Sequence, residues 1–316
     1  MTVTYPDIGE IRGQSDAKHG LLVAAIGGHN VLLVGPPGEG KTFISSTIHT
    51  FLPPFFPGEK DEVERIYSYT GRATPYGRPF VSVSPHTTQI NLVGGGQTPT
   101  PGAISLAHMG VLFMDEFPEY DKKLIESLRG PLQNGSIEIT RGGVTEIFGC
   151  EFQLLAAMNP CPCGYYPQEA CKCTPIQVQR YQRKLSGPML DRIDMIIQLA
   201  KVPFSELFAP QIPNQSSLWR QKVLKAIKFR YHTRGQLHSN SRIPTHKTFE
   251  PNGKTYRWTK DAMELLDKIA GNPTFSSRKL VRLTRLSRTI ADMSSKEDTE
   301  GRHVEDAYKF LNYHFI

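Results

Sequence analysis

The sequence lacks any apolar run that approaches the ~18 consecutive apolar residues of a membrane-spanning helix. Residues 1–10 also lack a basic segment followed by an apolar one, so no secretory signal peptide is expected. Cysteine is scarce, and four of the five cysteines lie between Cys161 and Cys173. So local a cluster excludes a disulfide framework and favours metal binding. We therefore expect a cytoplasmic protein.

Acidic residues are outnumbered, with 30 Asp and Glu against 37 Lys and Arg, which gives a formal net charge of +7. Such an excess is compatible with a polyanionic partner, and equally with an ordinary basic protein. Hydrophobic residues make up 39% of the 316 residues. A chain of this length and composition can bury a sizeable core in one large or two smaller domains.

The most informative motif is a glycine-rich loop of the pattern G-x-x-x-x-G-K-S/T. It consists of Gly35, Pro36, Pro37, Gly38, Glu39, Gly40, Lys41 and Thr42. Its glycines let backbone N–H groups point inward around an anion. Lys41 adds positive charge at the outer phosphates, and the Thr42 hydroxyl is placed to bind Mg²⁺. An apolar run at 31–34 and a helix-like segment at 43–48 complete a strand–loop–helix unit, in which the helix N-terminus favours an anion.

A second apolar run, at 111–114, ends in Asp115 and Glu116. A buried parallel strand delivers its C-terminal residues to the ligand crevice, so we expect Asp115 beside Thr42, holding Mg²⁺ through water. Glu116 is expected to orient and deprotonate the attacking water. The alternative is a strand that runs into an acidic helix cap; the phosphate-binding loop upstream favours the Mg²⁺ interpretation.

Asn159 ends another predicted strand, at 152–158. Its amide is placed to contact the γ-phosphate or the attacking water; the alternative is a turn-forming asparagine before Pro160.

The cysteine cluster consists of two C-x-C pairs, Cys161 with Cys163 and Cys171 with Cys173. Four thiolates that converge over a short loop suit tetrahedral zinc. The usual zinc spacing is C-x₂₋₄-C, so reduced structural thiols remain the alternative.

Periodicity and breaker residues predict an α/β fold: a parallel sheet with helices on both faces, followed by a helical lid. We assign residues 1–200 to the core and residues 201–316 to the lid, with a linker at 201–213. Further strands are expected at 80–84 and 195–199, and a β-hairpin at 136–140 and 144–148. Helices are expected at 16–26, 122–132, 174–185, 218–232, 259–269, 276–293 and 304–313. In helix 276–293 the arginines at 278, 282, 285 and 288 line one side, which is typical of a solvated face. Residues 61–78 allow no assignment, and 239–258 are expected to be irregular.

Several further motifs resemble one family closely. They are Gly94 to Gly96, Pro101 to His108, Ala156 to Gly164, Gln179 to Tyr181 and Ser186 to Asp194. With the order of the other elements, they are similar to the AAA+ ATPases of the magnesium-chelatase-like ComM/YifB type, from about residue 7 to residue 308.

This resemblance implies roles for individual residues. Lys41, Thr42, Asp115 and Glu116 would hold and hydrolyse MgATP, and Asn159 would be the sensor residue. Arg192 resembles a finger that reaches into the ATP site of a neighbouring subunit, and Arg278 resembles the second sensor arginine.

The resemblance also implies an activity: ATP-driven branch migration of DNA by a ring, expected to be a hexamer. Residues 91–105 and the hairpin 137–148 would line its central pore. Proteins of this type normally carry a Lon-protease-like domain before the ATPase, which is expected to be missing here. A magnesium-chelatase motor subunit and a protein-remodelling ATPase remain the alternatives; against the former, the C-x-C pairs are a ComM-type feature.

Overall fold

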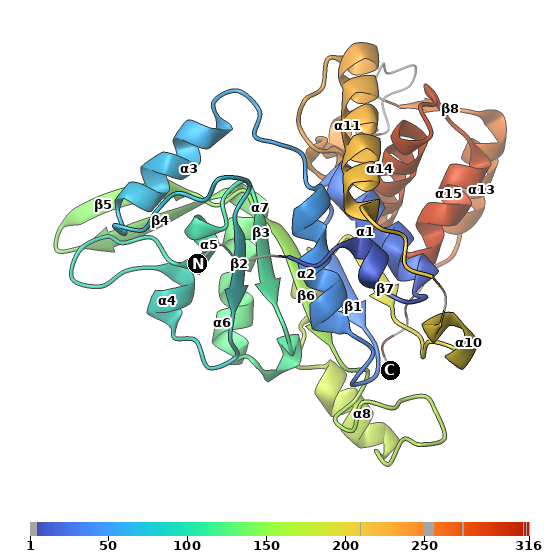
Figure 1. Cartoon of the computed structure of the whole chain (residues 1–316), viewed down its shortest axis with the longest axis horizontal. Helices are drawn as coiled ribbons and strands as arrows, with labels where there is room; N and C mark the ends of the chain where they lie inside the picture. The colour runs from blue at the N-terminus through green and yellow to red at the C-terminus, as the bar shows by residue number, and fades with distance from the viewer. Residues whose placement is uncertain are drawn as a thin grey trace.

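The computed structural model describes residues 5–208, 210–248, 256–273, 275–311, 313 and 315. A five-stranded sheet lies at its centre, with strand order β2-β3-β6-β1-β7 and every neighbouring pair parallel (Figure 1). The strands are β1 (Val31–Val34), β2 (Phe80–Val83), β3 (Val111–Met114), β6 (Gln153–Met158) and β7 (Met195–Gln198). The predicted α/β class is confirmed, and the sheet is consistent with a P-loop NTPase fold.

The central strands are covered on both faces, which explains why they read as continuous apolar runs. All residues of β1, β3 and β6 are buried. Alternate side chains of β1 enter two separate cores: Val31 and Leu33 pack with one cluster, Leu32 and Val34 with the other. The first cluster draws on α1 (Ser15–Gly27), α2 (Lys41–Phe51), α11 (Gln215–Arg234) and α14 (Ser277–Met293). The second draws on α5 (Ala103–Leu106), α6 (Lys122–Ser127), α8 (Pro175–Gln182) and α9 (Gly187–Leu190).

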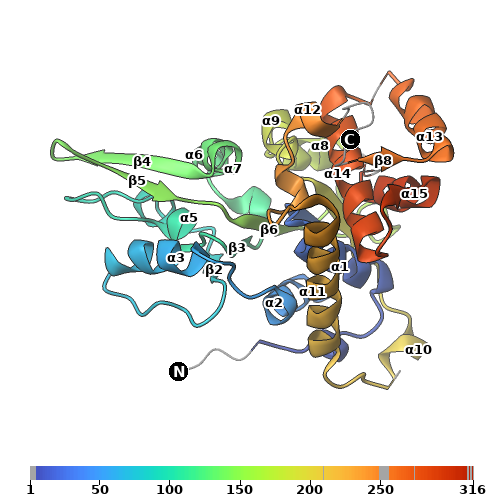
Figure 2. The same cartoon turned by 90° about the horizontal axis from the view of Figure 1, so that it is seen from above.

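A β-hairpin extends from the sheet, as predicted. Its strands are β4 (Ser136–Arg141) and β5 (Val144–Gly149), which pair in antiparallel register. It projects at the end of the molecule opposite to α13 (Lys260–Ala270) and α15 (Gly301–Lys309), beside α3 (Glu59–Ser68) and α4 (Gln89–Val93) (Figures 1 and 2). Phe148 and Ile139 of the hairpin pack with Ile66 of α3 in a small separate core.

The C-terminal part is mainly helical, and the helices predicted there are found within a few residues of their expected bounds. Besides α11 and α14 it contains α10 (Phe204–Leu207), α12 (Thr245–Thr248), β8 (Arg257–Trp258), α13 (Lys260–Ala270), β9 (Asp298–Thr299) and α15 (Gly301–Lys309). The predicted linker, 201–213, thus contains α10. Of the segment predicted to be irregular, 239–258, residues 249–255 lie outside the described residues. Among the helices that are described, none is long and apolar enough to cross a bilayer.

One helix expectation was wrong, and one helix was not predicted. The single helix expected at 122–132 is divided into α6 and α7 (Arg129–Asn134). Pro131 has no N–H to donate to Ser127, so the ladder of hydrogen bonds is interrupted there. The unassigned segment 61–78 begins within α3, whose apolar positions Val63 and Ile66 alone are buried. A stripe of two residues is too short a pattern to predict a helix.

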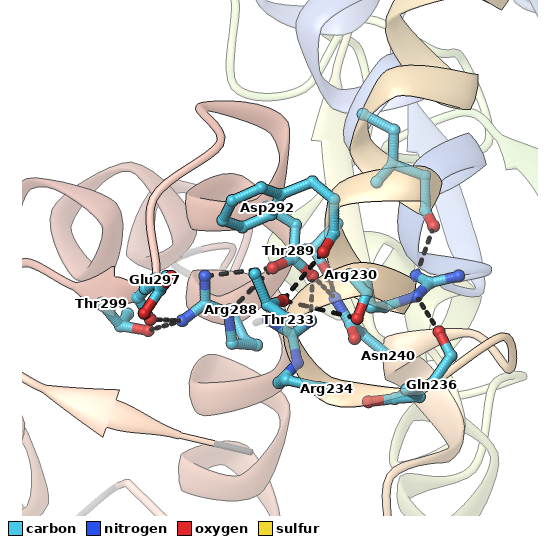
Figure 3. Close-up of polar contacts among 12 residues, drawn as sticks. Arg230, Thr233, Arg234, Gln236, Asn240, Arg288, Thr289, Asp292, Glu297 and Thr299 are labelled. Carbon is cyan, nitrogen blue, oxygen red and sulfur yellow. Dashed lines mark hydrogen bonds and ion pairs between the residues drawn. The ribbon is translucent and has the colours of Figure 1, made fainter. Parts of the chain in front are cut away.

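The arginine row of α14 is not a solvated face. Arg288 is fully buried, and Arg282 and Arg285 are partly buried; Arg278 is exposed. Figure 3 shows Arg288 donating hydrogen bonds to the Glu297 carbonyl, at 2.6 Å, and to the carboxylate of Asp292, at 3.1 Å. The expectation failed because backbone carbonyls and a buried carboxylate take the place of water around this helix.

The same polar cluster connects the helical part to the sheet domain. Arg230 of α11 donates to the carbonyl of Ile26, at the end of α1, at 3.1 Å. His29, just after α1, bonds the Thr289 hydroxyl of α14 at 2.7 Å. Burial lowers the pKa of Arg230 to about 10, so it keeps its charge at neutral pH. Contacts of this kind hold α14 against the core at a fixed position.

Candidate functional site

The glycine-rich loop joins β1 to α2 at the carboxyl edge of the sheet. Gly38 and Gly40 have φ of +84° and +75°, in the left-handed region that other residues rarely adopt. Gly35 is needed for a different reason, since a Cβ there would lie 2.8 Å from the Cβ of Leu199 on the β7 side. Gly40 is the N-cap of α2, so the N-terminus of this helix opens onto the loop.

Lys41 crosses the loop rather than pointing into solvent. Its ammonium group donates to the carbonyls of Gly35 and Pro36 at 2.8 and 2.7 Å. A third hydrogen bond, at 2.8 Å, goes to the side-chain oxygen of Asn159. Burial lowers the pKa of Lys41, and nearby carboxylates, Asp115 foremost, oppose that shift. The loop, the lysine and Asn159 at the end of β6 therefore form one connected unit.

Thr42 and Asp115 come together as predicted, because β3 ends beside the start of α2. The Thr42 hydroxyl donates to one carboxylate oxygen of Asp115, and the other accepts the N–H of Glu116 at 2.9 Å. This donor set consists of a hydroxyl and a carboxylate, which are the oxygen ligands that Mg²⁺ prefers. Glu116 turns away from the strand with φ of +50° and is exposed, so its carboxylate is free to face a bound substrate.

A hollow beside the loop escaped the sequence analysis. It has a volume of about 360 Å³, and the loop contributes Gly38, Glu39 and Gly40 to its wall. The opposite wall comes from the segment before α1 and from the segment after β7. These residues are Glu10, Ile11, Arg12, Gln14, Lys201, Val202 and Leu207, with Phe43 of α2. The apolar part of this lining, next to a phosphate-binding loop, suits a planar base. No local sequence pattern marks residues 6–14 as part of a site.

Arg192 and Arg278 do not lie with the phosphate-binding loop. Both line a different pocket, of about 630 Å³, between the sheet domain and α14, and no residue of the loop lines that pocket. Arg192 donates to the Pro188 carbonyl at 3.0 Å and to Gln133 at 2.7 Å. Arg278 donates to Asp191 at 2.5 Å. The Asp191 carboxylate, next to Arg192 in the sequence, thus pairs with Arg278 rather than with Arg192.

The four clustered cysteines converge. Their sulfur atoms all lie within 4.8 Å of one another. The Sγ atoms of Cys161 and Cys163 are 3.4 Å apart, and Cys171 lies 3.8 and 3.6 Å from these two. A tetrahedral zinc with Zn–S bonds of ~2.3 Å separates its sulfurs by about 3.8 Å. A disulfide needs ~2.05 Å, so the spacing fits a metal better than a bridge.

The backbone around the cluster also suits metal-bound thiolates. The N–H groups of Gly164 and Tyr166 donate to Cys161 Sγ at 3.2 and 3.4 Å. Hydrogen bonds from the N–H groups of Tyr165 and Lys172 lower the pKa of Cys163 to about 6, whereas burial and the neighbouring cysteine thiols raise the pKa of Cys171 to about 11, so Cys163 is the thiolate that the protein itself favours. A thiolate is the form that binds metal. Cys150 lies apart, and burial raises its pKa to about 12.

Comparison with known families gives the same picture. The family described as "Magnesium chelatase, subunit ChlI" matches residues 7–207, and its counterpart "Magnesium chelatase, subunit ChlI C-terminal" matches residues 213–311. The chain belongs to the magnesium-chelatase-like AAA+ family. Within this family it is 35% identical over 309 residues to "Uncharacterized protein YifB" of Escherichia coli, covering 96% of the chain and 60% of that protein. It is 37% identical over 308 residues to "Competence protein ComM" of Haemophilus influenzae, covering 95% and 59%. The predicted ComM/YifB membership is confirmed.

A more distant similarity reaches a eukaryotic member of the AAA+ class. The chain is 23% identical over 333 residues to "DNA replication licensing factor Mcm6" of Anopheles gambiae, covering 97% of the chain and 37% of that protein. The chain spans about 60% of the length of YifB.

Proposed function

We propose that this chain hydrolyses MgATP in a ring of identical subunits and uses the cycle to move DNA. The observation that carries the proposal is the division of the predicted site. The phosphate-binding group lies at the carboxyl edge of the sheet, whereas Arg192 and Arg278 line a pocket without any residue of the loop. A site divided in this way becomes complete when the arginines of one subunit face the loop of the next.

Within one subunit, the chain's own groups would bind ATP as follows. Lys41 exchanges its bonds with the Gly35 and Pro36 carbonyls for phosphate oxygens, while it keeps Asn159 as a neighbour. Thr42 and Asp115 hold Mg²⁺, which when bound neutralises charge on the phosphates. Glu116 orients the attacking water and accepts its proton.

Arg192 and Arg278 are the reason why a second subunit is needed. A guanidinium near the γ-phosphate stabilises the charge of the transition state, and an arginine supplied in trans is worth ~10³-fold or more in rate. Arg192 is half-buried and fixed by Gln133 and the Pro188 carbonyl, so it is held ready for such a contact. Arg278 shares its pocket and would face the same nucleotide.

The hairpin and the neighbouring segment 94–101 favour DNA as the polymer that the ring moves. The Arg141 guanidinium, near the hairpin tip, lies over Gly95: a Cβ built there would be 3.2 Å from it. A β-bridge between Gly94 and Pro101 closes the base of the segment 94–101. A basic side chain on paired projecting segments suits a phosphate backbone. The net charge of +7 and the similarity to Mcm6, a DNA replication licensing factor, point the same way.

A chelatase motor is the second candidate, because the matching family is named after magnesium chelatase. The decisive experiment measures ATP turnover alone, with single-stranded or branched DNA, with a porphyrin and its chelatase partners, and with unfolded protein. We expect DNA to stimulate turnover. Arg141→Ala should reduce that stimulation and lower the salt dependence of DNA binding by about one phosphate contact. Arg302→Ala, an exposed arginine on α15, serves as the control. Stimulation by the porphyrin system alone would refute the DNA proposal.

For the four cysteines we propose one bound zinc ion. Metal analysis of protein purified without added zinc should find about one equivalent. The double variant Cys161→Ser/Cys163→Ser should lose it, and Cys150→Ser should keep it. A stable protein without metal would leave only the reduced-thiol interpretation.

A further inference from the structure

The cysteine segment, residues 161–173, is in direct contact with the phosphate-binding loop. Gly164 has φ of +88°, and a Cβ built on it would lie 2.5 Å from Cδ and 3.1 Å from Cγ of Pro37. Real Cβ atoms do not come so close to other atoms. The Cδ and Cγ atoms of Pro37 belong to a closed ring and cannot rotate away, so only glycine fits at position 164. The segment therefore packs against the wall of the nucleotide site.

The same segment is tied to Asn159 at both of its ends. Its first cysteine, Cys161, is fully buried and follows Asn159 by two residues. Its last cysteine precedes α8, and two side chains of α8 reach back to the same place. Gln182 donates to the Pro160 carbonyl at 3.0 Å, and Tyr181 is buried in the same core cluster as Met158, the residue before Asn159. Asn159 in turn holds Lys41.

Little besides the cysteines gives this segment its shape. Among residues 161–173 the structure has neither helix nor strand, and most of the side chains are exposed or only partly buried. A segment that buries so little apolar surface does not gain enough to order itself. Four sulfur–metal bonds would supply the missing constraint.

We propose that the metal held by the four cysteines positions Pro37 and Asn159, so that nucleotide affinity depends on whether the metal is bound. The cluster is then a positioning element of the ATP site, although none of its sulfurs touches the nucleotide. The inference rests on the proposed ATPase function and on the proposed zinc.

The first experiment titrates the protein with a fluorescent ATP analogue and Mg²⁺ before and after zinc is removed by a chelator that is then dialysed away. We expect the dissociation constant to rise about tenfold or more, the usual effect of losing an outer support of a site, and to recover when zinc is added back. If the zinc-free protein binds as tightly as the zinc-loaded one, or if fresh protein that binds nucleotide contains no metal, this inference is wrong while the ATPase proposal stands. If the zinc-loaded protein binds no nucleotide, the proposed function fails and this inference with it.

Removal of zinc can also unfold the segment more widely, so a second variant leaves all four ligands in place. Gly164→Ala introduces a methyl group against Pro37, and it should keep about one zinc equivalent and its helix content while nucleotide affinity falls about tenfold. The matched control is Gly58→Ala. Gly58 has the same φ of +88° but nothing within 4 Å of the added carbon, so its backbone strain is comparable and its contact is absent. Unchanged affinity in Gly164→Ala, or an equal loss in Gly58→Ala, would overturn the proposed coupling.

Discussion

Replacement of Asp292 by alanine is the sharpest test of how the helices of the C-terminal part are held together. Asp292 is fully buried on α14. One of its oxygens accepts Arg288 Nε at 3.1 Å. The other accepts Arg234 at 2.6 Å and the Asn240 amide at 2.8 Å. Figure 3 shows these groups, which come from α11, α14 and the turn after α11, converging on the one carboxylate.

The expected magnitude follows from burial. The Arg234 side chain is 5% exposed and that of Arg288 is 0% exposed, so neither can exchange the lost carboxylate for water without moving. Breaking a buried ion pair by removing one partner costs about 3–5 kcal/mol, because it leaves an uncompensated charge. At about 2–4 °C of melting temperature per kcal/mol in a chain of this size, the midpoint should fall by roughly 10 °C.

The assay is a urea titration followed by circular dichroism, together with a thermal scan, at neutral pH. The control is Asp298→Ala, since Asp298 is 48% exposed and pairs with Arg257 at the surface. That variant should stay within about 1 kcal/mol of the parent. If Asp292→Ala is no less stable than Asp298→Ala, the buried cluster does not hold α11 and α14 together, and our account of the arginine row is wrong.

Two further predictions concern the ATP site, and a third concerns the pair between His19 of α1 and Asp306 of α15. Lys41→Ala should weaken nucleotide binding, because the lysine contacts the phosphates of bound ATP before the reaction begins. Glu116→Gln should keep nucleotide binding and lose turnover, because the glutamate acts on the attacking water. If phosphate release shows normal turnover in Glu116→Gln, Glu116 is not the base. Arg192→Ala and Lys41→Ala should each be nearly inactive but should regain part of the ATPase activity when mixed, and increasingly so at higher protein concentration. Mixed rings that form and stay inactive would rule out the trans assignment. The hydrogen bond from His19 lowers the pKa of Asp306 in the folded protein. The ionised Asp306 therefore stabilises the fold at pH values above ~3.9, the pKa of an unfolded aspartate. This stabilisation is lost as the pH falls through the lower pKa of the folded state. In urea titrations the difference between the parent and Asp306→Asn should therefore shrink from pH 6 to pH 3; a constant difference would contradict this.

The sequence was sufficient for the sheet and the loop because their signals are local. Residues 31–34 are apolar without interruption, and the Gly and Lys spacing follows at once, so strand, loop and helix are all specified within twenty residues. The meeting of Thr42 with Asp115 was also predictable, since parallel strands present their carboxyl ends at one edge. The convergence of the four cysteines followed in the same way from their short spacing.

What the sequence did not disclose depends on partners far along the chain. Arg288 looks like any surface arginine until Asp292 and the carbonyls after α14 surround it. Arg278 pairs with Asp191, which lies 87 residues away in the sequence, and no local pattern near either residue predicts this contact. The base-sized hollow combines residues before α1 with residues after β7, and no periodic pattern marks either segment.

The burial gradient along α14 has a mechanical consequence. The exposed fraction of the side chain falls from 69% at Arg278 to 11% at Arg282 and 0% at Arg288. One end of the helix is thus clamped, and the other carries a charge at the rim of a pocket. At about 15 Å from the clamp, a rotation of roughly 10° would move Arg278 by about 2.6 Å. That distance is enough to make or break its hydrogen bond with the Asp191 carboxylate. A small rotation of the helical part about the buried Arg288 would therefore be amplified into a change in the position of Arg278 relative to that carboxylate.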